Sequence, residues 1–306
     1  MRIQAARDAL DGLSVGDALG EQFCGPPDEM RAAALARRAR PAPWRWTDDT
    51  LMASSVFEVL AAGREDDQDA YARSFAERYE PGRGHGPATR DLLSAIGSGG
   101  DWRTLAPAAF GGRGSWGNGA AMRVGPLGAF HAGDPAGAAR AAARQAVVTH
   151  THAEAVDGAV AVAVAASVGA ASRGGTAPGF AEVLGASLER LGETRTAAGL
   201  RQALRLGPGT DPATAGAVLG TGAGVAAFDT VPFALWSAAC SPDDYEETFW
   251  RTVVVLGDRD TTCAIAGAVV GARVGPSGIP QAWLAAREPL PPWVGAGSRP
   301  GSAVSR

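Results

Sequence analysis

The chain has 306 residues and a formal net charge of −4, with 46% hydrophobic and 20% charged residues. These values are ordinary for a globular protein with one sizeable core, and the net charge gives no general attraction to nucleic acid, although a basic stretch from Arg31 to Arg45 could meet an anionic ligand. The longest apolar run, Ala159 to Ala166, is too short to span a bilayer, so we expect no membrane segment.

The N-terminus and the cysteines indicate where the protein acts. Residues Met1 to Gln4 run directly into an acidic amphipathic pattern and lack the apolar core of a signal peptide, which predicts a cytoplasmic protein. Cys24, Cys240 and Cys263 are too widely spaced for a zinc knuckle or a disulfide framework. We expect a monomer without a nucleic-acid or membrane partner.

Apolar residues recur at helical spacing from the start of the chain. Ile3, Ala6, Leu10 and Leu13 predict an amphipathic first helix, which leads into the Gly16–Gly20 segment. Residues 155–171 are rich in Ala and Val and apolar nearly all round, which predicts a buried helix.

Two further helices are predicted near the C-terminus. Ser241 opens a capping-box pattern for a helix over residues 242–255, with Gly257 as the residue that ends it. After Asp260, small residues recur on one face, which predicts a helix that packs closely in the core. These residues are Ala264, Ala268, Gly271, Ala272 and Gly275. The sequence therefore predicts an all-α architecture.

Two segments lack helical spacing. Gly220 to Gly224 has no preceding strand and no following phosphate-binding lysine, so a flexible loop is favoured over a nucleotide fingerprint. Residues 288–306 are rich in Pro, Gly and Ser, and we expect them to form a mobile tail after one domain of residues 1–287.

Two clusters of oxygen-bearing side chains, Thr47-Asp48-Asp49-Thr50 and Asp258-Arg259-Asp260-Thr261-Thr262, each open an apolar helix. One interpretation is capping, because Thr and Asp are preferred at helix starts and acids there complement the helix dipole. A second is a metal site, because carboxylates and hydroxyls are the hard ligands that suit Mg²⁺ or Mn²⁺. The repetition of the pattern favours the second, with four Asp and two Thr as the protein's share of a two-metal centre.

Asn118 is the only Asn of the chain, and all 28 basic residues are Arg. It lies in Gly117-Asn118-Gly119, where glycines could let backbone N–H groups approach a diphosphate at a helix start. The alternative is a tight turn that uses glycine for its positive φ. We favour the ligand contact and expect Ser115 and Met122 to line the same wall.

Five motifs in chain order resemble the ADP-ribosylglycohydrolase family over about residues 5–280. They are Gly16-Asp17-Ala18-Leu19-Gly20, Trp46-Thr47-Asp48-Asp49-Thr50, Gly117 to Arg123 with Pro126-Leu127-Gly128, Thr149-His150, and Gly257-Asp258-Arg259-Asp260-Thr261. The resemblance implies an all-α orthogonal helical bundle with a central two-metal cleft. The implied activity is hydrolysis of the glycosidic bond between ADP-ribose and a protein side chain or small molecule.

The resemblance also assigns residues. Two Mg²⁺ or Mn²⁺ ions would be held by Thr47, Asp48, Asp49, Asp258, Asp260 and Thr261. The substrate would contact Ser115, Gly117, Asn118, Gly119, Met122 and His150. Asp49 and Asp258 would also serve catalysis, because carboxylates stabilise an oxocarbenium-like transition state. We expect Asp17 to hydrogen-bond the ligands or the backbone, and His152 to be a cap or a surface residue.

Two positions depart from the family pattern. Many members carry Glu where this chain has Cys24, and Glu21 lies one helical turn earlier. Either Glu21 is the catalytic acid or base, or hydrolysis needs no separate carboxylate, or the chain is a catalytically impaired ADP-ribose-binding module. Arg259 replaces a common Thr, and its cation would be unfavourable beside metals unless the side chain points away or meets a phosphate. No motif distinguishes the acceptor or separates Mg²⁺ from Mn²⁺.

Overall fold

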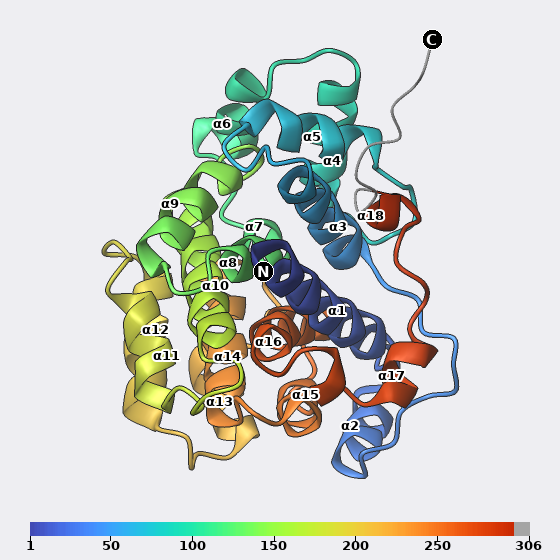
Figure 1. Cartoon of the computed structure of the whole chain (residues 1–306), viewed down its shortest axis with the longest axis vertical. Coiled ribbons are helices and arrows are strands. Elements are labelled where there is room, and N and C mark those ends of the chain that lie inside the picture. Colours follow the sequence, from blue (N-terminus) through green and yellow to red (C-terminus); the bar gives the residue numbers. More distant parts are fainter. Residues whose placement is uncertain (297–306) are drawn as a thin grey trace.

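The computed structural model describes residues 1–296, and every regular element in this range is a helix (Figure 1). The predicted all-α architecture is confirmed. Two isolated β-bridges join Trp44 to Arg287 and Gly117 to Ala226. The helices are α1 (Arg2–Glu21), α2 (Pro27–Leu35), α3 (Asp48–Ala61), α4 (Gln68–Glu77), α5 (Pro87–Gly97), α6 (Trp102–Gly112), α7 (Gly119–Met122), α8 (Gly125–Phe130), α9 (Pro135–Ala146), α10 (Ala153–Ala171), α11 (Phe180–Leu188), α12 (Arg195–Leu206), α13 (Pro212–Leu219), α14 (Ala227–Cys240), α15 (Tyr245–Val253), α16 (Arg259–Val274), the 3₁₀ turn η1 (Pro276–Gly278), α17 (Gln281–Ala286) and α18 (Trp293–Ala296).

Helices α1 and α16 lie side by side at the centre of the molecule (Figure 1). Their backbones touch because glycines face each other across the contact. A Cβ on Gly12 would lie 2.3 Å from the carbonyl oxygen of Gly267, and one on Gly16 would lie 2.2 Å from that of Cys263. At Gly20 it would lie 3.0 Å from the Cα of Asp260. This contact sets the start of α16 against the end of α1.

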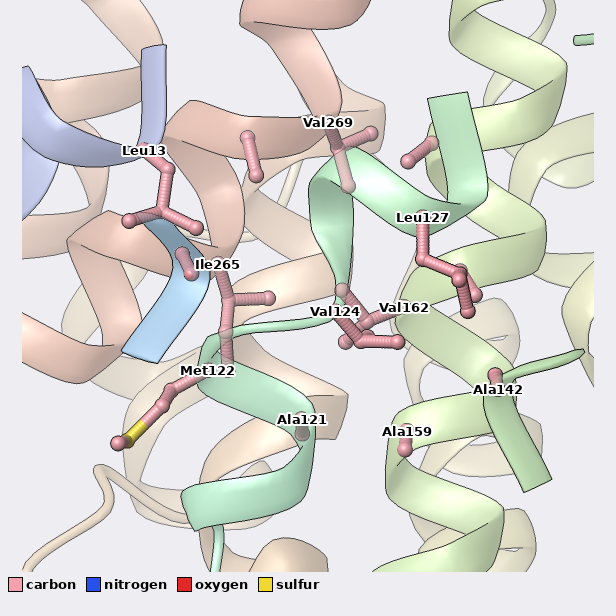
Figure 2. Close-up of a cluster of buried hydrophobic side chains, with 14 of the residues drawn as sticks. Leu13, Ala121, Met122, Val124, Leu127, Ala142, Ala159, Val162, Ile265 and Val269 are labelled. Carbon is pink, nitrogen blue, oxygen red and sulfur yellow. The ribbon is translucent and has the colours of Figure 1, made fainter. Parts of the chain in front are cut away.

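Helix α10 is the second central element, and it is buried almost all round, as the sequence predicted. Its length and composition would allow it to cross a membrane, but 78% of its apolar window is buried inside the protein, as in the core helix of a globular domain. Figure 2 shows part of the surrounding core, where Leu13 of α1, Val124, Val162 of α10 and Ile265 of α16 belong to one cluster.

The predicted helix over residues 242–255 is shorter in the structure. It begins at Tyr245 because the Asp244 side chain, not Ser241, caps it by accepting a hydrogen bond from the Glu247 N–H at 2.9 Å. Gly257 lies beyond the end of this helix with a φ of 68°, and a Cβ there would lie 2.2 Å from the carbonyl oxygen of Thr221. Position 257 therefore requires glycine because the loop that contains Thr221 lies against it.

The segment expected to be a mobile tail contacts the body in its described part, residues 288–296. Glu288 pairs with Arg83 at 2.8 Å, and the Trp46 indole donates to the Pro289 carbonyl at 3.2 Å. Val294 is buried. Residues 297–306 of the expected tail lie outside the described part of the chain.

The α1–α16 contact predicts a large effect of one methyl group. We expect Gly16→Ala to lower the free energy of unfolding by about 3 kcal/mol, because the new Cβ would overlap backbone that cannot rotate away. Gly185→Ala in α11 is the matched control, since nothing lies within 4 Å of its Cβ position. The control should gain up to about 1 kcal/mol from helix propensity. Urea unfolding of both variants measures the difference, and equal midpoints would contradict this account of the contact.

Candidate active site

The two predicted clusters lie at the starts of α3 and α16. Thr47 is the N-cap of α3, and its hydroxyl accepts a hydrogen bond from the Asp49 N–H at 3.3 Å. Asp258 is the N-cap of α16 by position, but its side chain makes no capping hydrogen bond. Capping therefore accounts for Thr47 and leaves the Asp258 carboxylate unexplained.

Asp17 joins the end of α1 to the start of α3. Its fully buried carboxylate accepts hydrogen bonds from the Thr47 N–H at 3.0 Å and from the Thr47 hydroxyl at 2.9 Å. It also accepts from the N–H and the hydroxyl of Thr50. As expected, Asp17 holds the backbone and one proposed ligand.

Four further carboxylates lie around this junction. Asp48 and Asp49 start α3, Asp258 and Asp260 start α16, and the Thr261 hydroxyl donates to Asp49 Oδ2 at 3.4 Å. The tertiary fold thus brings together the two clusters that lie about 210 residues apart in the sequence.

Burial and mutual repulsion dominate the electrostatics of this group. Burial, together with the charge of nearby carboxylates, raises the pKa of Asp17 to about 7 and that of Asp48 to about 8. Burial and Asp260 likewise raise the pKa of Asp258 to about 7, and the pKa of Asp49 is raised well above its ordinary value. These acids resist ionisation at neutral pH unless positive charge is added.

The donor set fits divalent cations. Asp49 Oδ1 is buried without a hydrogen-bond partner, and the surrounding groups are carboxylates and hydroxyls. As the side chains stand, however, no three His, Cys, Asp or Glu residues among those described form a ready metal site.

Arg259, which departs from the family pattern, donates through its guanidinium to the backbone carbonyl of Phe23 at 2.7 Å. Its charge acts on Glu21, whose pKa it lowers against the larger effect of burial.

A cleft of about 520 Å³ opens above the carboxylates. All six residues predicted to contact substrate line it: Ser115, Gly117, Asn118, Gly119, Met122 and His150. Asp48, Asp49, Asp258, Asp260 and Thr261 line it too, whereas Thr47 does not.

The Asn118 side chain has a role that the sequence did not indicate. Its amide nitrogen donates to Asp258 Oδ2 at 2.6 Å and to the Thr230 hydroxyl at 3.0 Å. Because the Thr230 hydroxyl gives its proton to the Ala226 carbonyl at 2.9 Å, it accepts from Asn118, which requires the amide nitrogen on this side. The amide therefore orients a proposed metal ligand, and a contact between Asn118 and ADP-ribose stays a prediction.

The glycines beside Asn118 serve close packing. Neither has a positive φ, so the tight-turn explanation fails. A Cβ on Gly119 would lie 2.9 Å from the His150 ring, and one on Gly117 would lie 3.3 Å from the Ser115 hydroxyl. The anion cradle is also weaker than expected, because the N–H groups of Gly117 and Asn118 already donate to Ser115 and Val225. Helix α7 has only four residues, too few for an appreciable dipole.

His150 is a buried neutral ring in the cleft wall. Burial and the nearby Arg123 lower its pKa to about 3. Its Nδ1 lies 2.7 Å from the Thr149 hydroxyl, which accepts a hydrogen bond from Arg123 at 2.8 Å. His152 caps α10 by accepting from the Glu154 N–H, as the capping interpretation predicted.

Glu21 faces a second cavity of about 460 Å³, which adjoins the cleft at Gly84 and Asp260. Burial, together with Asp260, raises the pKa of Glu21, and Cys24 Sγ donates to its carboxylate at 3.3 Å. Glu21 is thus close enough to Asp260 to feel its charge, but it lines the second cavity and not the cleft.

The sequence analysis missed three parts of the site. Gly84 packs against Asp48, since a Cβ there would lie 3.0 Å from its Oδ1. The loop regarded as merely flexible supports the start of α16, because the Thr221 carbonyl accepts a hydrogen bond from the Asp258 N–H at 3.0 Å. Phe110 and Trp116, with ring centroids 4.8 Å apart, form an aromatic wall of the cleft. The paired glycines in these loops were the available signal for the first two.

Known proteins are similar to this chain in sequence and in fold. The profile of the ADP-ribosylglycohydrolase family matches residues 2–296. "ADP-ribosylhydrolase ARH3" of Danio rerio is 29% identical over an alignment that covers 92% of this chain and 86% of the relative. An uncharacterized protein of Archaeoglobus fulgidus is 31% identical, with 91% and 90% covered.

A solved structure described as an "ADP-ribosylglycohydrolase-related protein complex" has a TM-score of 0.61 to this chain at 27% identity, with 94% of this chain and 93% of that chain covered. Fold, sequence and motif order agree with one another. The chain belongs to the ADP-ribosylglycohydrolase family.

Proposed function

We propose that this protein is a metal-dependent hydrolase that cleaves the glycosidic bond between ADP-ribose and its acceptor, either a protein side chain or a small molecule. Its family and its ARH3 relatives are named for hydrolysis of ADP-ribose linkages. The observation that carries the proposal is the group of four carboxylates, the buried Asp49 and the half-buried Asp48, Asp258 and Asp260, that lines a cleft of about 520 Å³. Such a cleft has the size expected for a nucleotide-like ligand.

Members of this family depend on metal ions in general. We propose that two divalent cations, Mg²⁺ or Mn²⁺, are held by the oxygens of Thr47, Asp48, Asp49, Asp258, Asp260 and Thr261. When bound, they would polarise water and hold the ribose diol. The unpartnered Asp49 Oδ1 and the raised pKa values of Asp48 and Asp258 support this assignment.

The chain's own residues have separable roles in this mechanism. The cleft orients ADP-ribose, with its base against the exposed ring of Phe110 and its ribose over the carboxylates. Asp49 and Asp258 stabilise positive charge that develops at the anomeric carbon. Glu21 gives a proton to the departing acceptor from the second cavity, because its raised pKa keeps it protonated at higher pH than an ordinary Glu.

The metal assignment predicts that a substitution of a proposed ligand lowers both metal affinity and activity. We expect Asp49→Asn and Asp260→Asn each to lower metal affinity and the rate of ADP-ribose release by at least tenfold, because each removes a ligand charge. Calorimetric titration with Mg²⁺ and Mn²⁺ measures the metal affinity. The rate of ADP-ribose release is measured with added metal and with EDTA. Asp91→Asn, at an exposed site of α5, is the matched control. Full turnover in excess EDTA would exclude a metal mechanism.

The Asn118–Asp258 hydrogen bond predicts that Asn118 serves metal binding rather than direct contact with ADP-ribose. We expect Asn118→Ala to lower metal affinity and activity by about 10- to 100-fold, as loss of a residue that orients a metal ligand does. Metal titration and ADP-ribose titration should be run on the same folded variant. Normal metal affinity with weakened ADP-ribose binding would instead favour the direct substrate contact.

The role of Glu21 predicts a change in pH dependence. A general acid must be protonated, so kcat should fall as the pH rises through the pKa of Glu21. We expect Glu21→Gln to lower kcat by about 10²- to 10⁴-fold and to remove that alkaline limb. Cys24→Ser should be mild. An unchanged rate in Glu21→Gln would exclude this role.

The second candidate is an impaired ADP-ribose-binding module, which Cys24 favours. That candidate predicts an inactive parent chain in which Cys24→Glu gains turnover while metal and ADP-ribose binding stay as in the parent.

A further inference from the structure

The second cavity is built at the junction of α1, the segment after α2 and the loop before α5. The end of the basic stretch seen in the sequence borders it, through Arg40, Pro43 and Arg45. Glu21 lines it as well, and Gly84 and Asp260 line both this cavity and the cleft. The two cavities therefore adjoin at Asp260, one of the proposed metal ligands.

Arg40 and Arg45 are exposed, and neither forms an ion pair within residues 1–296. Neighbouring arginines differ in this respect: Arg37 pairs with Glu247, and Arg83 pairs with Glu80 and Glu288. Arg40 donates only to the sulfur of Met30, at 3.6 Å, which is a weak acceptor. The charge of Arg45 helps to lower the pKa of Glu288, but that carboxylate is paired with Arg83. Among residues 1–296, two guanidinium groups at the rim of the cavity are thus without an ion-pair partner of their own.

The segment that carries these arginines is held in place. The buried Trp44 donates its indole N–H to the Arg40 carbonyl at 2.8 Å, and its backbone N–H donates to the Ala286 carbonyl at 2.8 Å. The next tryptophan, Trp46, is stacked under Arg83, whose guanidinium carbon lies 3.5 Å from the ring centroid. Fixed tryptophans on either side of Arg45 give the rim a defined shape.

We propose that this second cavity binds the acceptor part of the substrate and selects acceptors that carry an anionic group beside the glycosidic bond. This inference rests on the proposed function, since it takes ADP-ribose to occupy the cleft. The departing group then lies beyond Asp260, beside Glu21. Arginine pairs with carboxylates and phosphates through two parallel hydrogen bonds. A cationic acceptor would be repelled by the same two side chains.

Two sources can supply the anionic group: acidic residues of a peptide acceptor, or a phosphate on a small acceptor. The test therefore uses three peptides that differ only in flanking residues, with Glu, Gln or Lys beside the ADP-ribosylated residue. ADP-ribose that carries phosphate on its anomeric oxygen is the fourth substrate. Preference for the Glu peptide identifies the first source, and preference for the phosphate identifies the second.

The matched variants are Arg40→Gln with Arg45→Gln, compared with Arg38→Gln, an exposed arginine of the same segment that does not line the cavity. We expect the double variant to lower kcat/KM for the anionic substrate by about tenfold, two- to fivefold per exposed ion pair. The Gln peptide should change little, and the affinity for free ADP-ribose should equal that of the parent. Arg38→Gln should behave like the parent throughout.

Equal kcat/KM for the Glu, Gln and Lys peptides and the phosphate would overturn the acceptor proposal while leaving the hydrolase function intact. Equal losses in Arg38→Gln and the double variant would also overturn it, because general electrostatic attraction would then explain the preference. If no substrate releases ADP-ribose, the proposed function fails. Fluorescence anisotropy of labelled unmodified Glu and Gln peptides, at two salt concentrations, then decides whether the cavity binds anions, and equal affinities would overturn it.

Discussion

The site depends on the direct backbone contact between α1 and α16. Glycines at 12, 16 and 20 let the two helices approach until carbonyl oxygens of α16 occupy the space that side chains would fill. That approach places Asp17 of α1 beside Asp260 of α16, and Asp17 in turn fixes the start of α3 through Thr47 and Thr50. Because protein interiors are close-packed, a methyl group at this contact would move the start of α16 relative to the start of α3. The proposed metal ligands on the two helices would then be displaced from one another.

The same contact creates an electrostatic cost. Carboxylates that would ionise near pH 4 in water are buried together, and burial and repulsion raise the pKa values of Asp17, Asp48 and Asp258 to about 7, 8 and 7. The folded state holds these protons more tightly than the unfolded chain. Without added positive charge, the free energy of unfolding therefore falls as the pH rises from about 4 to about 8. Bound cations would offset this loss. Instability of this kind is common where a site is organised for chemistry.

Two cavities meet at Asp260 and Gly84, and their linings differ in chemistry. The cleft offers aromatic rings, backbone and the neutral His150, which suit a nucleotide. The second cavity offers Glu21 and unpaired arginines, which suit proton transfer and an anionic acceptor. Bond cleavage between the two cavities would leave ADP-ribose on one side and the acceptor on the other. In the mechanism that we propose, Glu21 serves the departing group and Asp258 serves the ribose.

The sequence alone determined the helical class, the buried character of α10 and α16, and the two clusters of oxygen-bearing side chains that we propose as metal ligands, because these follow from local periodicity and from motifs of a few residues. It also indicated the family. Cellular location, oligomeric state and the acceptor stay predictions. Only the tertiary structure decided that Asn118 orients Asp258, that Gly119 makes room for His150, that residues 288–296 contact the body and that Glu21 faces a different cavity from the nucleotide cleft. Each of these depends on residues at least 31 positions apart in the sequence, or on which face of a helix end meets open space, and no local pattern encodes either.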